Sequence, residues 1–166
     1  MNINPLIFVL AIPAFAAAFL AVVPDYRISS RVNVLASFAT LLAALSLFVH
    51  HPEPDSYFLI DDLNIVFIVL STFVGFSTSV FSATYIAHEL EIGRLTSAYL
   101  RFYHAMYQIM MFGMNLALVS NNIGLMWVAI ELATLATILT LIVLAVLPPV
   151  EAYFKRRAGS TPDHHE

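Results

Sequence analysis

Five apolar runs, each long enough to cross a lipid bilayer, follow one another along this chain of 166 residues. They cover residues 5–23, 32–49, 63–87, 102–120 and 123–147. A hydrocarbon core about 30 Å thick needs roughly 20 apolar residues in a helix, and lipid offers no partner to an unpaired backbone group. The pattern therefore predicts an all-α, polytopic membrane protein with five transmembrane helices.

The composition supports this class and excludes several kinds of chemistry. Only 11% of the residues are charged and 60% are hydrophobic, whereas a soluble domain carries about 25% charged residues. The chain has no cysteine, so it provides no disulfide, thiolate metal site or iron–sulfur ligand. It also lacks a Gly-rich phosphate loop and the common hydrolase motifs. We therefore expect no cofactor, no metal and no redox centre in this chain, and no nucleic acid among its partners.

Glu131 is the only charged residue in the last apolar run. It lies roughly 12 Å beyond Ile123 along a helix that rises about 1.5 Å per residue, which places it near the middle of the bilayer. An ionised acid at that depth costs about 2.5–3.5 kcal/mol on insertion scales, and such residues usually belong to an ion or proton path. We predict that Glu131 is a proton site. The alternative is a permanently protonated carboxyl that makes one hydrogen bond between helices.

Polar residues also recur along one face of the fourth run. His104, Gln108 and Asn115 are separated by four and seven residues, which is one stripe of a helix. Each residue alone could be a packing residue with its hydrogen bonds satisfied. The tight turn at Asn121–Asn122 returns the fifth helix beside the fourth, so we expect Asn115 within a helical turn of the level of Glu131, where the two could form a hydrogen bond. The sequence thus predicts a proton path formed by Glu131, Asn115, Gln108 and His104.

Two further patterns have more ordinary interpretations. The third run carries small or hydroxyl-bearing residues on one helical face, at Ser71, Gly75, Thr78, Ser82 and Tyr85. Such a face predicts close helix packing first, and it could also line hydrated space. The adjacent His50 and His51 begin the acidic loop, residues 50–62 between the second and third runs. They could hold zinc, but no other ligand converges on them, so a solvated loop is favoured.

The basic residues indicate how the chain is oriented in the membrane. All seven fall in alternate connections or after the last run, at Arg27, Arg31, Arg94, Arg101, Lys155, Arg156 and Arg157. The positive-inside rule then predicts an outside N-terminus, an inside C-terminus and an outer acidic loop. Residues 1–147 are the predicted membrane domain. Residues 148–166 are a predicted cytoplasmic tail, partly disordered because it is short and polar.

The segment 102–134 resembles the antiporter-like membrane subunits of complex I and related hydrogenases, in particular hydrogenase 4 component F. The residues that carry the likeness are FYHAMYQ at 102–108 and FGMNLALVSNNIGLMWVAIELAT at 112–134, together with SATYI at 82–86. The resemblance implies a membrane subunit of a proton-translocating hydrogenase or NADH/quinone oxidoreductase-type complex. It also implies a place in the inner (plasma) membrane.

The resemblance further implies a role for Glu131, which matches the glutamate of the family's fifth helix. In the family this glutamate is paired with a lysine on the seventh helix, and members have many more spans than five. Lys155 does not match that lysine. We therefore expect other membrane subunits as partners, including one that supplies the lysine helices. The alternatives are a non-transporting anchor subunit of such a complex and a truncated inactive fragment.

A physical argument leads to the same expectation of a partner. In a medium of low dielectric constant a carboxyl favours its neutral form, and a cation brought close favours the charged form. A proton site of this kind is therefore loaded and emptied by a movable positive charge. None of the five apolar runs contains Lys or Arg, so the charge has to come from another chain.

Overall fold

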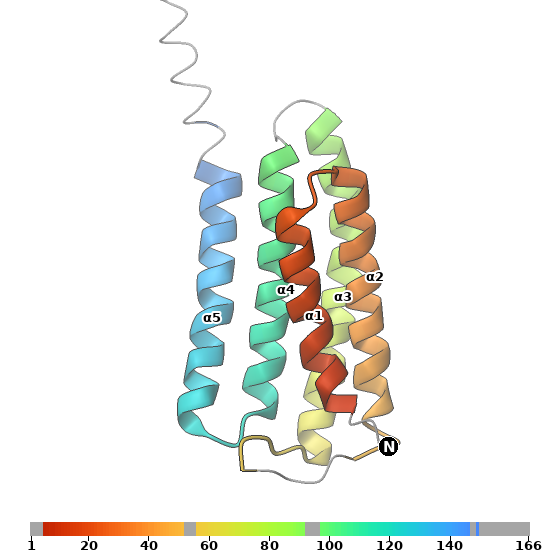
Figure 1. Cartoon of the computed structure of the whole chain (residues 1–166), viewed down its shortest axis with the longest axis vertical. Coiled ribbons are helices and arrows are strands. Elements are labelled where there is room, and N and C mark those ends of the chain that lie inside the picture. The colour runs from red at the N-terminus through yellow and green to blue at the C-terminus, as the bar shows by residue number, and fades with distance from the viewer. Residues whose placement is uncertain (1–4, 52–55, 92–96, 147–148, 150–166) are drawn as a thin grey trace, which may run out of the picture.

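The computed structural model describes residues 5–51, 56–91, 97–146 and 149. It is a bundle of five long helices that lie side by side (Figure 1), which confirms the predicted all-α class. The helices are α1 (Pro5–Val22), α2 (Tyr26–Ser46), α3 (Asp62–Glu91), α4 (Ser97–Val119) and α5 (Ile123–Leu141). A π-helical turn, Ile142–Val146, continues α5.

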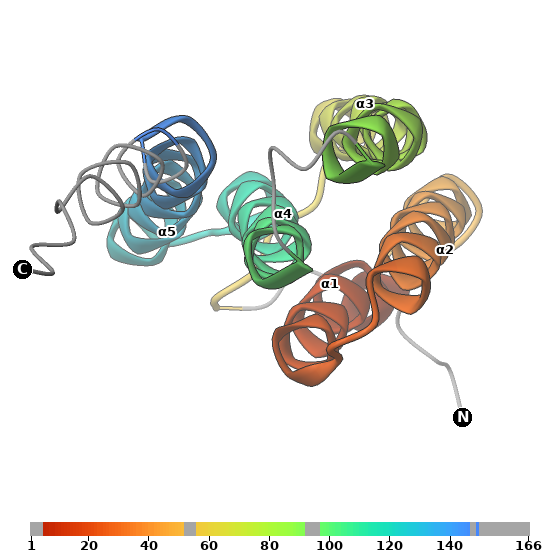
Figure 2. The ribbon, with the colours of Figure 1, turned by 90° about the horizontal axis from the view of Figure 1, so that it is seen from above.

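Four of the helices in the described part of the chain are long and apolar enough to cross a bilayer. Their mean hydropathy is 2.5 in α1, 1.5 in α2, 2.0 over Asp62–Tyr85 and 2.4 over Ile123–Val146. The predicted span in α4 falls outside this set, since His104, Gln108 and Asn115 make that helix more polar. α4 can be more polar than the other helices because of its position. It contacts each of the other four helices and lies in the middle of the bundle (Figure 2). Its polar face therefore meets protein, where polar side chains are tolerated at membrane depth.

The other helices are arranged unevenly around α4. α1 packs on α2, and α2 packs on α3, so these three helices surround part of α4. Among the described helices α5 packs on α4 alone, and Figure 2 shows it at the edge of the bundle. Within α5 only Ala129 and Ala136 are buried. Most of the surface of α5 is therefore uncovered by the described part of the chain.

The start of α2 differs from the prediction. The predicted run begins at residue 32, but the helix begins at Tyr26. Asp25 caps it, because its Oδ1 atom accepts hydrogen bonds from the backbone N–H groups of Arg27 (2.8 Å) and Ile28 (3.4 Å). An Asp N-cap satisfies amides that a helix start leaves unpaired. The connection between α1 and α2 is therefore short, and α2 begins six residues before the predicted run.

The tight turn between α4 and α5 is confirmed. The Asn122 Oδ1 atom caps α5 by accepting from the N–H groups of Gly124 (2.8 Å) and Leu125 (3.2 Å). The loop before α3 is joined to this turn, since the N–H of Leu59 donates to the Val119 carbonyl oxygen (3.0 Å). The acidic loop and the α4–α5 turn therefore lie at the same end of the bundle, as does the N-terminal end of α1 (Figure 1).

The two ends of the bundle differ in character. The helix ends that carry Arg27, Arg31 and Arg101 lie opposite the acidic loop. The predicted tail 148–166 falls outside the described residues apart from position 149. At the acidic-loop end the interior is apolar, with a buried cluster of Leu6, Val9, Ala44, Leu47, Ile60, Ile65, Ile68 and Val119. This cluster closes the inside of the bundle at that end.

Candidate functional site

Glu131 occupies the middle of α5 and is exposed on the surface of the bundle. It has no ion-pair partner among the described residues. Lipid does not solvate a carboxylate, so an acid at this depth needs a protein or aqueous partner. The exposed position thus presents the carboxyl to whatever covers α5 in the membrane.

The hydrogen bond that Asn115 could have made to Glu131 is not formed among the described residues. Asn115 is fully buried, and neither its Oδ1 nor its Nδ2 atom has a partner among the described residues. The reason is helix geometry. α4 meets α5 through Gly113, and residues two positions apart point about 200° apart around a helix. Asn115 therefore lies on the side of α4 that faces away from α5.

The contact between α4 and α5 depends on small residues. A Cβ atom built on Gly113 would lie 2.9 Å from the Ala129 carbonyl oxygen and 3.0 Å from the Ala133 nitrogen. The backbones of the two helices are therefore as close as a residue without a side chain allows. Gly113 and Ala117 on α4 and Ala129 and Ala133 on α5 form two small-xxx-small pairs, a pattern that favours close packing of membrane helices.

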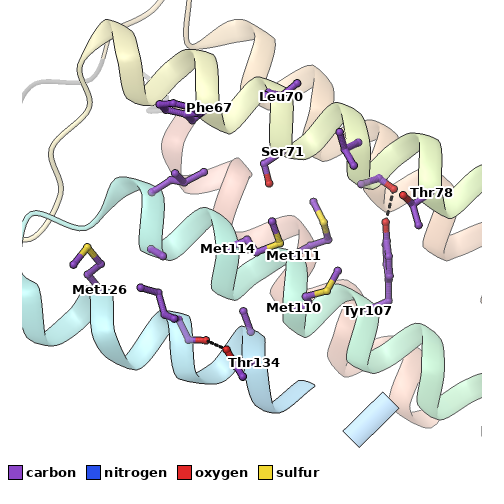
Figure 3. A pocket seen from close by; sticks show the side chains of 16 residues that line it. Phe67, Leu70, Ser71, Thr78, Tyr107, Met110, Met111, Met114, Met126 and Thr134 are labelled. Atoms are coloured by element: carbon purple, nitrogen blue, oxygen red, sulfur yellow. Dashed lines mark hydrogen bonds between the residues drawn. The ribbon is translucent and has the colours of Figure 1, made fainter. Parts of the chain in front are cut away.

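A cavity of about 690 Å³ lies between α3, α4 and α5. Its walls are apolar, and Figure 3 shows four methionines in them, at Met110, Met111, Met114 and Met126. α5 contributes Ile130 and Thr134 among others, so the cavity borders the helix that carries Glu131. Thr134 lies one turn beyond Glu131, and its Oγ1 atom donates to the Ile130 carbonyl oxygen (2.9 Å).

The remaining predicted path residues lie in a different place, on the face of α4 that meets α2. The Gln108 Nε2 atom donates to the Asn33 Oδ1 atom (2.8 Å), to the Asn33 carbonyl oxygen (3.2 Å) and to the Ser37 Oγ atom (3.1 Å). His104 and Gln108 are fully buried. The structure therefore groups His104, Gln108 and Asn115 inside the bundle and places Glu131 outside it.

The polar face of α2 was missed in the sequence. Ser29, Asn33, Ser37 and Thr40 are all buried, and they are spaced by four, four and three residues, which is one helical face. This spacing could have revealed the polar face of α2 in the sequence. Asn33 and Ser37 contact Gln108 on α4, and we call these four residues of α2, together with His104, Gln108 and Asn115, the polar seam.

Two of the five residues on the small-residue face of α3, Gly75 and Ser82, contact α4. Ser82 and Tyr103 share a hydrogen bond between their hydroxyl groups (2.7 Å), and the Tyr107 hydroxyl donates to the carbonyl oxygen of buried Gly75. Ser71 and Thr78 line the cavity. Tyr85 is exposed and takes no part in this packing.

The histidines of the acidic loop form no metal site with the residues that the structure describes. The His51 Nε2 atom lies 3.3 Å from the Asp62 Oδ1 atom, and both side chains are largely exposed. Exposed pairs of this kind contribute little to stability.

Comparison with known proteins connects this arrangement to a group of membrane proteins. Residues 53–103 match the family model described as the N-terminus of chain 5 of NADH-ubiquinone oxidoreductase (complex I). Over 147 residues, or 89% of its length, the chain is 51% identical to the hydrogenase-4 component F homolog of Methylacidiphilum infernorum. The chain spans about a third of that relative, 31% of its length. No solved structure matches.

Proposed function

This chain is an antiporter-like membrane subunit of the complex I and hydrogenase type, and from this premise we propose a role for Glu131. We propose that Glu131 is the contribution of this chain to the proton path of such a complex. The family match covers the acidic loop, α3 and the start of α4. The alignment with the hydrogenase-4 relative extends over most of the chain. What is proposed beyond this membership is the role of Glu131 and the identity of its partners.

One observation carries the proposal: a single carboxyl lies exposed halfway along an apolar helix that packs on α4 alone within the described chain. Such an acid is costly in lipid and is tolerated when it faces protein or water. The exposed side of α5 is therefore where another membrane segment belongs. A cation on that segment would favour the charged carboxylate, and its withdrawal would favour the neutral acid.

This switching defines the chemical role of the chain. Glu131 takes up a proton when the cation is distant and releases it when the cation is close, so movement of a charge in the partner moves a proton across this position. The chain has no cysteine, so it provides no thiolate ligands for an iron–sulfur cluster, and the role proposed for Glu131 requires no redox group. Oxidation and reduction belong to other subunits of the proposed complex.

The proposed partners are other membrane subunits of a respiratory or hydrogenase complex in the inner (plasma) membrane. One of them supplies the cationic helices that complete the site at Glu131. The uncovered surface of α5 and the methionine-lined cavity beside it are the surfaces on which such helices would pack. Methionine side chains adapt readily to the shape of a packed neighbour.

Copurification tests this proposal most simply. The tagged chain, extracted from membranes in a mild detergent, is expected to elute with other membrane subunits and with a redox subunit of a hydrogenase or quinone oxidoreductase. An unrelated multi-pass protein with the same tag serves as the control. Elution of the chain alone, with the redox subunits left in the unbound fraction, would contradict the proposed assembly.

The orientation of the chain gives a second test. The positive-inside rule predicts that the acidic loop faces outside and that the C-terminal segment faces the cytoplasm. The chain has no native cysteine, so the substitutions Ser56→Cys and Ser160→Cys introduce unique labels. An impermeant maleimide added to intact cells is expected to label the first variant and to leave the second unlabelled until the cells are opened. The reverse pattern would invert the assigned topology.

A further inference from the structure

The first two turns of α2 carry two arginines without an acidic partner among the described residues. Arg27 and Arg31 are exposed, and neither guanidinium group forms an ion pair with a described residue. Asp25, the nearest acid in the sequence, uses its Oδ1 atom to cap the helix. Residues four apart lie on the same side of a helix, with Cβ atoms about 5–6 Å apart. Both guanidinium groups can therefore reach one small anion.

The two arginines are unfavourably placed unless an anion lies between them. Like charges one helical turn apart repel each other. Arg31 also lies directly before the apolar run that starts at residue 32, where water is scarce. A phosphate group relieves the repulsion and can accept paired hydrogen bonds from a guanidinium group. The charges at the start of α2 therefore point to a ligand that carries a phosphate.

An apolar stripe continues from the arginines toward the middle of the membrane. Exposed side chains recur on one face of α2 with spacings of three, four and three residues, at Leu35, Phe38, Leu42 and Leu45. Arg31 lies one turn before Leu35 on the same face. Figure 2 shows α2 at the edge of the bundle, beside α3 and far from α5. A ligand held by the arginines therefore has apolar protein surface directly below it.

The stripe borders a groove between α2 and α3. Phe38 packs on Phe76 of α3, with ring centroids 5.2 Å apart. Beyond this pair the groove encloses about 350 Å³ and has apolar walls, formed by Leu41, Leu45, Phe48, Val66, Val69, Leu70 and Phe73. Leu41 lies ten residues beyond Arg31, or about 15 Å along the helix, which is about half of a 30 Å hydrocarbon core. The groove therefore begins one leaflet's depth below the arginines.

We propose that Arg27 and Arg31 bind the phosphate of one anionic phospholipid, whose acyl chain lies along the stripe of α2 toward this groove. Charge complementarity selects the headgroup, since the amine of a zwitterionic lipid already neutralises its phosphate. Basic residues at the membrane surface attract anionic lipids in this way. The lipid site is on the opposite edge of the bundle from α5 (Figure 2), so it is independent of the role proposed for Glu131.

Quenching of tryptophan fluorescence by brominated lipids tests the site. Trp127 is the only tryptophan, so Trp127→Phe provides a silent background. Leu35→Trp then places a probe one turn from Arg31. Phe81→Trp is the matched control, because Phe81 is exposed on α3 at a similar depth and lies about 140° around that helix from Phe76. The full chain is reconstituted into phosphatidylcholine vesicles with rising fractions of brominated phosphatidylglycerol.

We expect half-quenching of the Leu35→Trp probe at a roughly tenfold lower fraction of brominated phosphatidylglycerol than for the Phe81→Trp probe, because each arginine adds to the attraction. Arg31→Gln should remove most of this difference. Arg101→Gln should preserve it, since it removes the same charge from a half-buried position on α4. Brominated phosphatidylcholine should quench the Leu35→Trp probe equally in both variants, which checks that the probe still faces lipid.

Two results would overturn the proposal at this stage. Equal quenching of the two probes by brominated phosphatidylglycerol would show that α2 has no preference for the anionic lipid. An equal loss in Arg31→Gln and Arg101→Gln would show that the preference follows the total charge of this end of the bundle and not a site on α2.

Soluble phosphates test whether the ligand is a lipid. Inorganic phosphate and glycerol phosphate carry the same charged group without an acyl chain. Added in large excess, they are expected to leave the quenching of the Leu35→Trp probe unchanged, because the stripe of α2 holds the lipid through its chain as well. Recovery of the fluorescence would show that the arginines bind a free anion, and the assignment to a phospholipid would be wrong.

Discussion

Replacing Glu131 with glutamine is expected to abolish proton translocation by the assembled complex while leaving the complex intact. Glutamine keeps the size and polarity of the side chain but cannot exchange a proton. A positioned proton-transfer group typically contributes about 10²–10⁴-fold to a proton transfer, so flux in membrane vesicles should fall by about 100-fold or more. Because Glu131 is exposed on α5, the loss is not expected to come from a collapsed core.

Two variants serve as controls for this result. Glu131→Asp keeps a titratable carboxyl on a shorter side chain and should retain a measurable part of the flux. Leu135→Ala changes an exposed residue one turn further along the same helix and should retain nearly all of it. If Glu131→Gln assembled normally and translocated protons at the original rate, the anchor interpretation would replace the proton-site interpretation.

Substituting Gly113 with alanine is expected to weaken the attachment of α5 to the rest of the bundle. The new methyl group would lie 2.9 Å from the Ala129 carbonyl oxygen, which belongs to backbone and cannot rotate away. Overpacking of this kind costs about 1–3 kcal/mol, and Gly113→Leu should cost more. Since α5 packs on α4 alone within the described chain, the whole helix has to move. Loss of the chain from the heated complex, followed by gel filtration, measures the effect.

Gly75→Ala is the matched control, because it makes the same chemical change in a neighbouring helix. Its methyl group would meet the Met111 Cε and Sδ atoms, which lie at the end of a flexible side chain that can turn into the cavity. Alanine also gains about 1 kcal/mol over glycine in helix propensity. Gly75→Ala should therefore be close to neutral. Equal losses in the two variants would contradict the role assigned to the Gly113 contact.

Much of the fold could be predicted because lipid removes most alternatives. An apolar run of suitable length can only be a helix in a bilayer, and the cap at Asn122 fixed the turn into α5 where it was expected. The start of α2 was placed too late, at residue 32, since the predicted run was bounded by its apolar residues and the polar first turns from Tyr26 were left out. Asp25 was the signal for an earlier helix start.

The site was harder to predict because one-dimensional spacing does not say which side of a helix faces which neighbour. His104, Gln108 and Asn115 were grouped on one face, and Asn115 was expected near the level of Glu131 on α5. In the structure Gln108 bonds α2, and Asn115 is buried away from α5. Gly113 marks the face that α5 occupies, since close backbone approach requires a residue without a side chain. The seam on α2 was missed because serine and threonine in a membrane helix also bond their own backbone, as Ser37 and Thr40 do here.

Proton flux into liposomes that contain the purified chain alone, compared with liposomes that contain the assembled complex, tests the central claim most directly. The claim is that this chain supplies the carboxyl and another chain supplies the cation that switches it. It predicts no flux above empty liposomes for the chain alone, and a flux for the complex that is lost in Glu131→Gln. A Glu131-dependent flux from the isolated chain would contradict the claim and show that α1–α5 already form a complete path.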